Sequence, residues 1–111
     1  MIGVIGGTGP EGRGLATRFA LAGECVFIGS RNSQKGQEVA EEISESSGNL
    51  IQGGNNEEAA QKGDVIIISV PYEGHVNILS KLEAFLKNKI VINVVAPLVF
   101  GKNFISSITV E

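Results

Sequence analysis

The chain has 111 residues and a net charge of −3 at pH 7, which suits one domain of moderate size. This acidic balance argues against nucleic acid and anionic membranes as main partners, because both select a basic surface. No apolar run reaches the ~18 residues of a membrane-spanning helix, and no signal peptide precedes the first apolar segment, so we expect a cytoplasmic protein. The single cysteine, Cys25, excludes a disulfide framework or a cysteine-based metal site within the chain, and we expect it to be buried in a strand.

Apolar segments alternate with amphipathic segments along the chain. In chain order, we expect a strand over residues 1–6, a helix over 11–22, a strand over 25–29, a helix over 33–46, a short strand over 49–52, a helix over 56–62, a strand over 64–70, a helix over 73–86 and a strand over 89–95. The strand over 64–70 is the most apolar and should be central. Residues 97–111 show no clear final helix, so we expect the chain to be the first part of something longer or half of an assembled site.

The alternation of strands and helices predicts βαβ units, which build a parallel sheet. Near-continuous apolar strands indicate a sheet that is covered on both faces. With right-handed crossovers, the expected fold is α/β: a three-layer, Rossmann-like, doubly wound parallel sheet with strand order 3-2-1-4-5. We expect residues 1–111 to form one domain of this type.

A glycine pattern G-x-G-x-x-G lies in the segment IGGTGPEG, between the first predicted strand and the first predicted helix. In this context Gly7 permits a tight turn, Gly9 lets a pyrophosphate approach the backbone, and Gly12 lets the helix pack closely on the strand. The helix start offers N–H groups and partial positive charge to phosphates. A P-loop is disfavoured because no G-K-[ST] follows, and the alternative is a turn that binds nothing. The candidate binding residues of this loop are Gly7, Thr8, Gly9, Pro10, Glu11 and Gly12.

The end of the second predicted strand indicates which dinucleotide the loop holds. NAD-binding domains place a carboxylate there to hold the ribose 2′-hydroxyl, but the sequence after Gly29 is SRNSQK, without a carboxylate. Arg31 can bind a 2′-phosphate through paired hydrogen bonds, Ser30 can donate a further hydrogen bond to it, and Lys35 adds positive charge. These residues predict NADP(H) as the cofactor; the alternative is a solvated arginine and lysine on a surface turn.

Four segments together point to a known family. They are IGGTGPEGRGLA at 5–16, IGSRNSQKG at 28–36, VIIISVPYEGH at 65–75 and VVAPLVFGK at 94–102. They resemble the NADPH-dependent coenzyme F420 reductases, also called F420-dependent NADP oxidoreductases, over nearly the whole chain. The resemblance implies an N-terminal Rossmann domain that binds NADP and reversible hydride transfer between NADP and the deazaflavin coenzyme F420 as co-substrate.

The resemblance also implies roles for individual residues. Thr8 and the glycines would lie along the phosphates, and Ser30, Arg31 and Lys35 would bind the 2′-phosphate. Further expected contacts are Val70, Pro71 and Tyr72 on the nicotinamide side, and Val95, Ala96, Pro97 and Leu98 near the deazaflavin. The family's C-terminal part, which supplies further deazaflavin contacts and much of a homodimer interface, is missing from the sequence, which puts stand-alone catalysis in doubt.

Hydride transfer between two cofactors needs little acid–base chemistry from the protein, so we expect no catalytic side chain and no metal site. His75 lies early in the fourth predicted helix, where it can hydrogen-bond to the cofactor; the alternative is a histidine on a helix face. Two other functions stay open. The chain can be the NADP-binding half of another reductase, such as an imine or metal reductase, or a non-catalytic NADP-sensing or interaction module.

Overall fold

The computed structural model describes residues 1–70, 75–95 and 109–110. Within them the strands form one six-stranded sheet in the order β3-β2-β1-β4-β5-β6. The elements are β1 (Ile2–Ile5), α1 (Pro10–Leu21), β2 (Val26–Ser30), α2 (Ser33–Ser47), β3 (Gln52–Asn55), α3 (Asn56–Lys62), β4 (Val65–Ile68), α4 (His75–Leu82), the 3₁₀ turn η2 (Glu83–Phe85), β5 (Ile90–Val95) and β6 (Thr109–Val110).

Strand β1 lies between β2 and β4 and is parallel to both. Ile2 stands opposite Val26 on one side and opposite Val65 on the other. The predicted order 3-2-1-4-5 is therefore confirmed, and β4 is central as expected. Strand β6, which runs antiparallel to β5, was not predicted. Because the chain leaves β1 toward β2 and later returns to β4 on the opposite side, the carboxyl ends of β1 and β4 form the switch point at which such sheets bind ligands.

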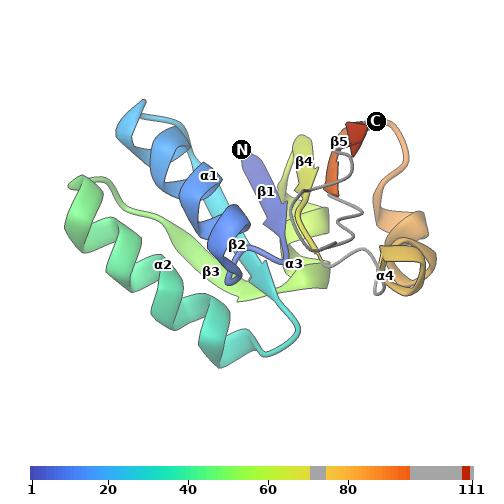
Figure 1. Ribbon diagram of the computed structural model, residues 1–111, viewed down its shortest axis with the longest axis horizontal. Helices are drawn as coiled ribbons and strands as arrows, with labels where there is room; N and C mark the ends of the chain where they lie inside the picture. The colour runs from blue at the N-terminus through green and yellow to red at the C-terminus, as the bar shows by residue number, and fades with distance from the viewer. Residues whose placement is uncertain (71–74, 96–108, 111) are drawn as a thin grey trace, which may run out of the picture.

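Side chains alternate between the two faces of the sheet and build two cores. Val4, Ile28 and Ile67 pack on the face that α1 and α2 cover. Ile5 and Phe27 pack on the opposite face, with residues of α3 and α4. Figure 1 shows α1 and α2 running side by side along their face. The three-layer prediction is confirmed, because every central strand is buried on both faces.

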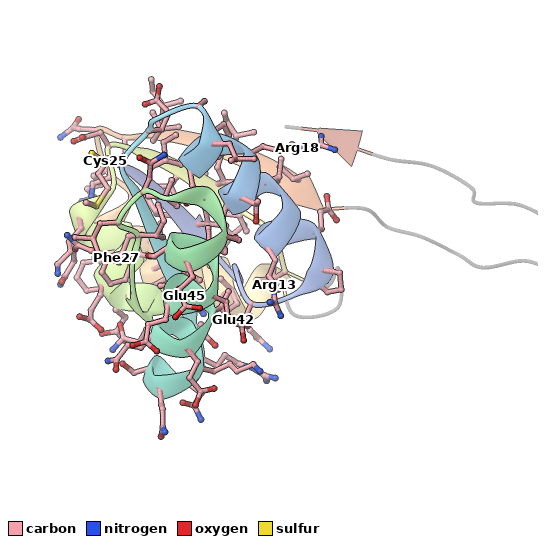
Figure 2. The ribbon with its side chains drawn as sticks, turned by 90° about the vertical axis from the view of Figure 1, so that its left-hand side faces the viewer. Arg13, Arg18, Cys25, Phe27, Glu42 and Glu45 are labelled. Carbon is pink, nitrogen blue, oxygen red and sulfur yellow. The ribbon has the colours of Figure 1, made fainter. Side chains whose placement is uncertain are left out.

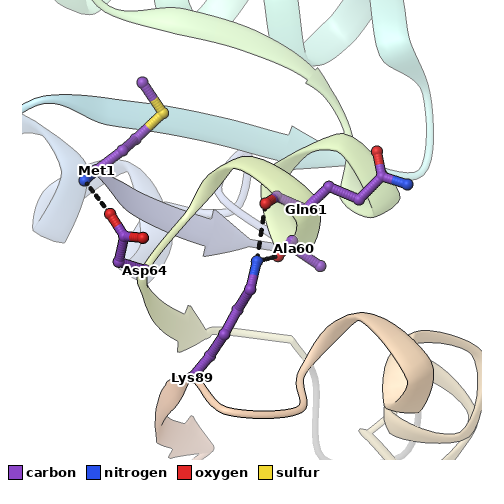
Figure 3. Close-up of polar contacts among 5 residues, drawn as sticks. All are labelled: Met1, Ala60, Gln61, Asp64 and Lys89. Carbon is purple, nitrogen blue, oxygen red and sulfur yellow. Dashed lines mark hydrogen bonds and ion pairs between the residues drawn. The ribbon is translucent and has the colours of Figure 1, made fainter.

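The helices begin and end at residues that satisfy their exposed backbone groups. The Asn32 side chain accepts a hydrogen bond from Lys35 N at the start of α2, and Gly48, with φ 77°, ends that helix in the left-handed conformation. Asn55 and Glu58 form a capping box at the start of α3. Lys89 Nζ donates to the Ala60 and Gln61 carbonyl oxygens at the end of α3 (Figure 3). These caps therefore set the residues at which α2 and α3 begin and end, and with them the distance along the chain from each helix start to the preceding strand.

The predicted third strand was misplaced. It was expected over 49–52, but β3 is Gln52–Asn55. The sequence QGGN has little β propensity, and what makes it a strand is close packing against α2. A Cβ on Gly53 would lie 2.1 Å from the Gly36 carbonyl oxygen, so the helix rests on the strand backbone to backbone.

The expectation that Cys25 is buried was also wrong. Strand β2 begins one residue later, at Val26, and Cys25 is exposed (Figure 2). The fourth predicted helix is likewise shorter than expected. It ends at Leu82 and continues as the 3₁₀ turn η2. Figure 2 also shows Arg13 of α1 beside Glu42 of α2, where their ion pair joins the two helices.

The chain start is held at the amino end of β4 by an ion pair. The Met1 ammonium group donates to Asp64 Oδ2 at 3.0 Å (Figure 3). This hydrogen bond, and then the charge of the same group, lower the pKa of the Asp64 carboxyl below its ordinary 3.8. Since the folded-state pKa is lowered, the carboxylate contributes stability above the ordinary pKa, and that contribution is lost as the pH falls through the folded value.

Asp64→Asn should therefore lower the melting temperature slightly at pH 7 and change the acid dependence of stability. The melting temperatures of variant and wild type should converge as the pH falls below 3.8, because protonation then removes the same charge from the wild type. Thermal unfolding between pH 2.5 and 7 measures this, with Glu41→Gln on the exposed face of α2 as the control. Parallel curves at every pH would contradict the role of Asp64.

Candidate functional site

A cavity of about 680 Å³ opens beyond the carboxyl ends of β1, β2 and β4. It is formed by the glycine loop, the turn from β2 to α2, the junction of β3 and α3, the end of β4, and α4. Its described lining residues are Gly6, Thr8, Gly9, Ser30, Arg31, Asn32, Lys35, Asn56, Ser69, Val70, Asn77, Ile78 and Lys81. The cavity therefore lies at the switch point of the sheet, where this type of fold binds ligands.

Gly6 and Gly7 both lie in the turn of the glycine loop, and the left-handed residue of the two is Gly6. Gly6 has φ +72°, and a Cβ there would lie 2.4 Å from the Ser69 carbonyl oxygen. Gly7 instead serves packing, because a Cβ at that position would lie 2.9 Å from Ile28 Cγ2. The backbone conformation that favours glycine is thus found one residue before Gly7.

Gly12 fulfils its expected role. A Cβ on Gly12 would lie 2.7 Å from the Gly6 carbonyl oxygen and 2.8 Å from Gly7 Cα, so α1 can approach the loop only with glycine here. Gly9 is different, since the one atom within 4 Å of a Cβ built there is the Gly6 oxygen at 3.8 Å. Gly9 therefore leaves the start of α1 open toward the cavity, where N–H groups can meet an anion.

Ser30 connects the glycine loop to the end of β2. It is buried, with 5% of its surface exposed, and its Oγ accepts a hydrogen bond from Asn32 N at 3.3 Å. The same Oγ lies 3.5 Å from Thr8 Oγ1. The Gly7 N–H donates to the Gly29 carbonyl oxygen at 2.8 Å, which adds a second connection. The two loops are therefore held at a fixed spacing.

The charges of the cavity are of one sign. Arg31, Lys35 and Lys81 are the charged residues of its described lining, and no carboxylate is among them. Arg31 lies in the turn between β2 and α2, Lys35 lies in the first turn of α2, and Lys81 comes from α4. Among the described lining residues there is also no histidine or cysteine. This arrangement suits a ligand with several anionic groups.

A second, smaller cavity of about 370 Å³ adjoins the first, sharing part of its wall. The shared residues are Ser30, Arg31, Asn56, Ile78 and Lys81. Its further residues are Asn55, Glu57 and Leu82. Together the two cavities give an elongated site that extends from the glycine loop over the end of β3.

The structure brings six of the predicted site residues together. These are Thr8, Gly9, Ser30, Arg31, Lys35 and Val70. Gly7, Pro10, Glu11 and Gly12 belong to the loop and the first turn of α1 but do not line the cavity; Glu11 is exposed. His75 begins α4 and Val95 ends β5. Pro71, Tyr72, Ala96, Pro97 and Leu98 lie outside the described residues.

Several lining residues were not among the predicted site residues. They are Gly6, Asn32, Asn56, Ser69, Asn77, Ile78 and Lys81. Of these, Asn56 could most readily have been found from the sequence. It is the first residue of a predicted helix and directly follows its N-cap, Asn55, which is also the last residue of β3. Lys81 carries no local signal, since its position over the cavity depends on how α4 packs.

Two other kinds of feature are absent from the part of the chain that the structure describes. No helix there has both the length and the apolar character needed to cross a membrane. No group of three or more histidine, cysteine or acidic side chains in the same residues is arranged to hold a metal ion.

Curated proteins similar to this chain include the F420-dependent NADP reductases of Methanothermobacter thermautotrophicus and Methanocaldococcus jannaschii. They are 38% identical over 100 residues and 39% identical over 103 residues. Each match covers 87% of this chain, but 43% and 45% of the respective relatives. The chain therefore spans less than half the length of the curated relatives it matches.

Solved structures with the same fold include a reductase and a dehydrogenase. An assigned F420-dependent NADP reductase from Arthrobacter sp. FB24 superposes with a TM-score of 0.74 at 21% identity, over 95% of this chain and 49% of that one. Malate dehydrogenase from Aeropyrum pernix superposes with a TM-score of 0.75 at 20% identity, over 88% and 37%. At these identities the likeness supports the fold alone.

The family model described as "NADP oxidoreductase coenzyme F420-dependent" matches residues 1–97. This match takes in the glycine loop, the cationic turn after β2 and the end of β4, which are the segments that form the cavity. The chain belongs to the coenzyme F420-dependent NADP oxidoreductase family.

Proposed function

We propose that this chain binds NADP(H) in the 680 Å³ cavity and forms the NADP half of an enzyme that transfers hydride between NADP and coenzyme F420. The observation that carries the proposal is the meeting of the glycine loop with Ser30, Arg31 and Lys35 in one cavity whose described lining has no carboxylate. A carboxylate at the end of β2 would repel a 2′-phosphate, whereas this lining attracts one.

The residues present fit such a dinucleotide. The open side of Gly9 and the start of α1 suit the pyrophosphate, because backbone N–H groups and the helix dipole favour an anion there. Arg31 and Lys35 suit the 2′-phosphate. When bound, NADPH supplies the hydride from its nicotinamide ring, and the work of the protein is to bind and orient the cofactor.

Ser69 and Val70, which follow β4, lie where the nicotinamide end of the dinucleotide would bind. Val70 is half-buried and lines the cavity, and it gives the ring an apolar surface to rest on. Hydride transfer depends chiefly on holding donor and acceptor carbons about 3–3.5 Å apart. The absence of a histidine or cysteine from the described lining is therefore compatible with the proposal.

The F420 part of the proposal is supported by the family and by the activity for which the curated relatives are named. Within it, residues 1–111 form one NADP-binding domain whose ligands are small-molecule cofactors and not nucleic acid. We include a cytoplasmic location and a homodimer in the same proposal. Sedimentation of the purified chain with and without NADPH tests the homodimer.

The first test is a fluorescence titration of the purified chain with NADPH and NADH side by side. We expect NADPH to bind at least tenfold more tightly, because the 2′-phosphate meets Arg31 and Lys35. Equal affinities would contradict the assignment of these residues. Oxidation of NADPH on adding F420 would then support the hydride-transfer step. Tight NADPH binding without turnover would instead favour the NADP half of another reductase, or a sensing module.

A further inference from the structure

Asn56 is the first residue of the helix predicted over 56–62, but the sequence analysis expected no role in the site for it. It is the first residue of α3, directly after β3, and only 8% of it is exposed. It lines both cavities. A buried amide side chain in the wall of a binding site needs partners for both its oxygen and its nitrogen.

The oxygen of Asn56 has a partner in the glycine loop. Asn56 Oδ1 accepts a hydrogen bond from Gly6 N at 3.1 Å, across 50 positions of the sequence. Gly6 is the residue with φ +72° that turns the chain from β1 into the loop. The hydrogen bond therefore holds the loop at its point of turning, and it joins the start of α3 to the end of β1.

The space for Asn56 is tightly fixed. A Cβ on Gly29, in β2, would lie 2.8 Å from Asn56 Oδ1, so glycine at that position leaves room for the amide. The helix that carries Asn56 starts with a capping box. Asn55 Oδ1 accepts a hydrogen bond from Glu58 N at 2.8 Å, and Glu58 Oε1 accepts one from Asn55 N at 3.1 Å. These capping bonds fix the backbone at the helix start, whereas the amide itself is held by Gly6 N.

The nitrogen of Asn56 has no such partner. Among the described residues, none accepts a hydrogen bond from Asn56 Nδ2. In the same residues, every side-chain nitrogen or oxygen that is fully hidden from solvent has a hydrogen-bond partner, so Nδ2 cannot be fully hidden. Nδ2 is therefore reached from the cavities that Asn56 lines. A donor in this position, beside the glycine loop, suits an oxygen atom of a phosphate or a ribose.

We infer that Asn56 is a positioning residue with two contacts: Oδ1 holds Gly6 in the turn, and Nδ2 donates to an oxygen of the bound dinucleotide. The contact of Nδ2 with the dinucleotide rests on the proposed function, whereas the contact of Oδ1 with Gly6 N does not, since it exists without a ligand. NADPH and NADH share the oxygens near the glycine loop, so Asn56 should affect both equally. Arg31 should instead affect NADPH alone.

Two substitutions separate the two contacts. Asn56→Ala removes the acceptor and the donor, whereas Asn56→Asp keeps an acceptor for Gly6 N and replaces the donor with negative charge. Glu58→Ala is the matched control, because it weakens the same helix start without lining either cavity. The measurements are amide hydrogen exchange of Gly6 by NMR and the Kd values for NADPH and NADH.

We expect Asn56→Ala to weaken both dinucleotides about tenfold, with the ratio of the two Kd values unchanged, and to speed exchange at Gly6 about tenfold. Asn56→Asp should lose affinity at least as strongly, while Gly6 stays protected. Glu58→Ala should keep both affinities within about twofold.

Three results would overturn the inference: a Gly6 amide that exchanges freely in the wild type, unchanged affinity in both Asn56 variants, or equal losses in Glu58→Ala. If Asn56→Ala does not fold, Asn56→Asp and the wild-type exchange rate still decide the matter. A wild type that binds neither dinucleotide would overturn the proposed function and the ligand contact, while Gly6 exchange would still test the Oδ1 contact.

Discussion

Arg31→Ala should weaken NADPH binding about thirtyfold and leave NADH binding within about twofold. A guanidinium that holds a phosphate makes charge-assisted hydrogen bonds worth about 1.5–3 kcal/mol, and 1.4 kcal/mol corresponds to a tenfold change in affinity. NADH carries no 2′-phosphate and so loses nothing from the substitution. The measurement is the pair of Kd values from nicotinamide fluorescence at fixed ionic strength, because salt screens this contact.

Arg18→Ala provides the matched control for Arg31→Ala. Arg18 is an exposed arginine of α1 that does not line the cavity (Figure 2). Arg18→Ala changes the net charge by the same amount as Arg31→Ala, so any general effect of charge on the binding of a polyanionic ligand appears in both variants. An equal loss of NADPH affinity in the two variants, or an equal loss of NADPH and NADH in Arg31→Ala, would contradict the assignment of the 2′-phosphate to Arg31.

Gly12→Ala should destabilise the fold by about 2 kcal/mol and lower the melting temperature by roughly 10 °C. The added Cβ would lie 2.7 Å from the Gly6 oxygen and 2.8 Å from Gly7 Cα, and both are backbone atoms that cannot rotate away. Either α1 moves off the sheet or the glycine loop shifts. The same shift should reduce NADPH affinity at least tenfold, as thermal unfolding and titration of one preparation will measure.

Gly9→Ala separates the two effects of a methyl group in this loop. Gly9 has φ −77° and ψ 166°, which alanine adopts readily, and no atom lies closer than 3.8 Å to the added Cβ. Stability should therefore change by no more than about 1 kcal/mol, the cost of alanine at an N-cap. NADPH affinity should still fall, because the methyl group stands where the pyrophosphate approaches. Unchanged affinity in Gly9→Ala would show that no ligand comes close to this backbone.

Most elements could be predicted from the sequence because their signals are local. The α3 helix over 56–62 was placed at the observed residues, since an N-cap, helical periodicity and a following glycine all lie within one short segment. The third strand could not be placed, because QGGN becomes a strand only through its pairing with β2 and its contact with α2. Cys25 was misjudged for a related reason: one position decides whether a residue belongs to a buried strand or to its exposed end.

The candidate site divides in the same way. Ser30, Arg31 and Lys35 could be found because they follow a recognisable strand at a known distance from the glycine loop. Asn56 and Lys81 could not, since each reaches the cavity from an element far along the chain. Their place depends on how α3 and α4 pack against the sheet, and no short segment of sequence encodes that packing.

The sequence by itself determined the order of strands and helices, the parallel sheet, and the cationic turn opposite a glycine loop. These follow from periodicity, turn chemistry and chirality, which act over a few residues or one crossover. Only the tertiary structure decided that Gly6 is the left-handed residue of the turn, that β3 begins at Gln52, and that Asn56 holds the loop. Each of these depends on close contact between atoms of separate elements, which is set by tertiary packing and not by local preference.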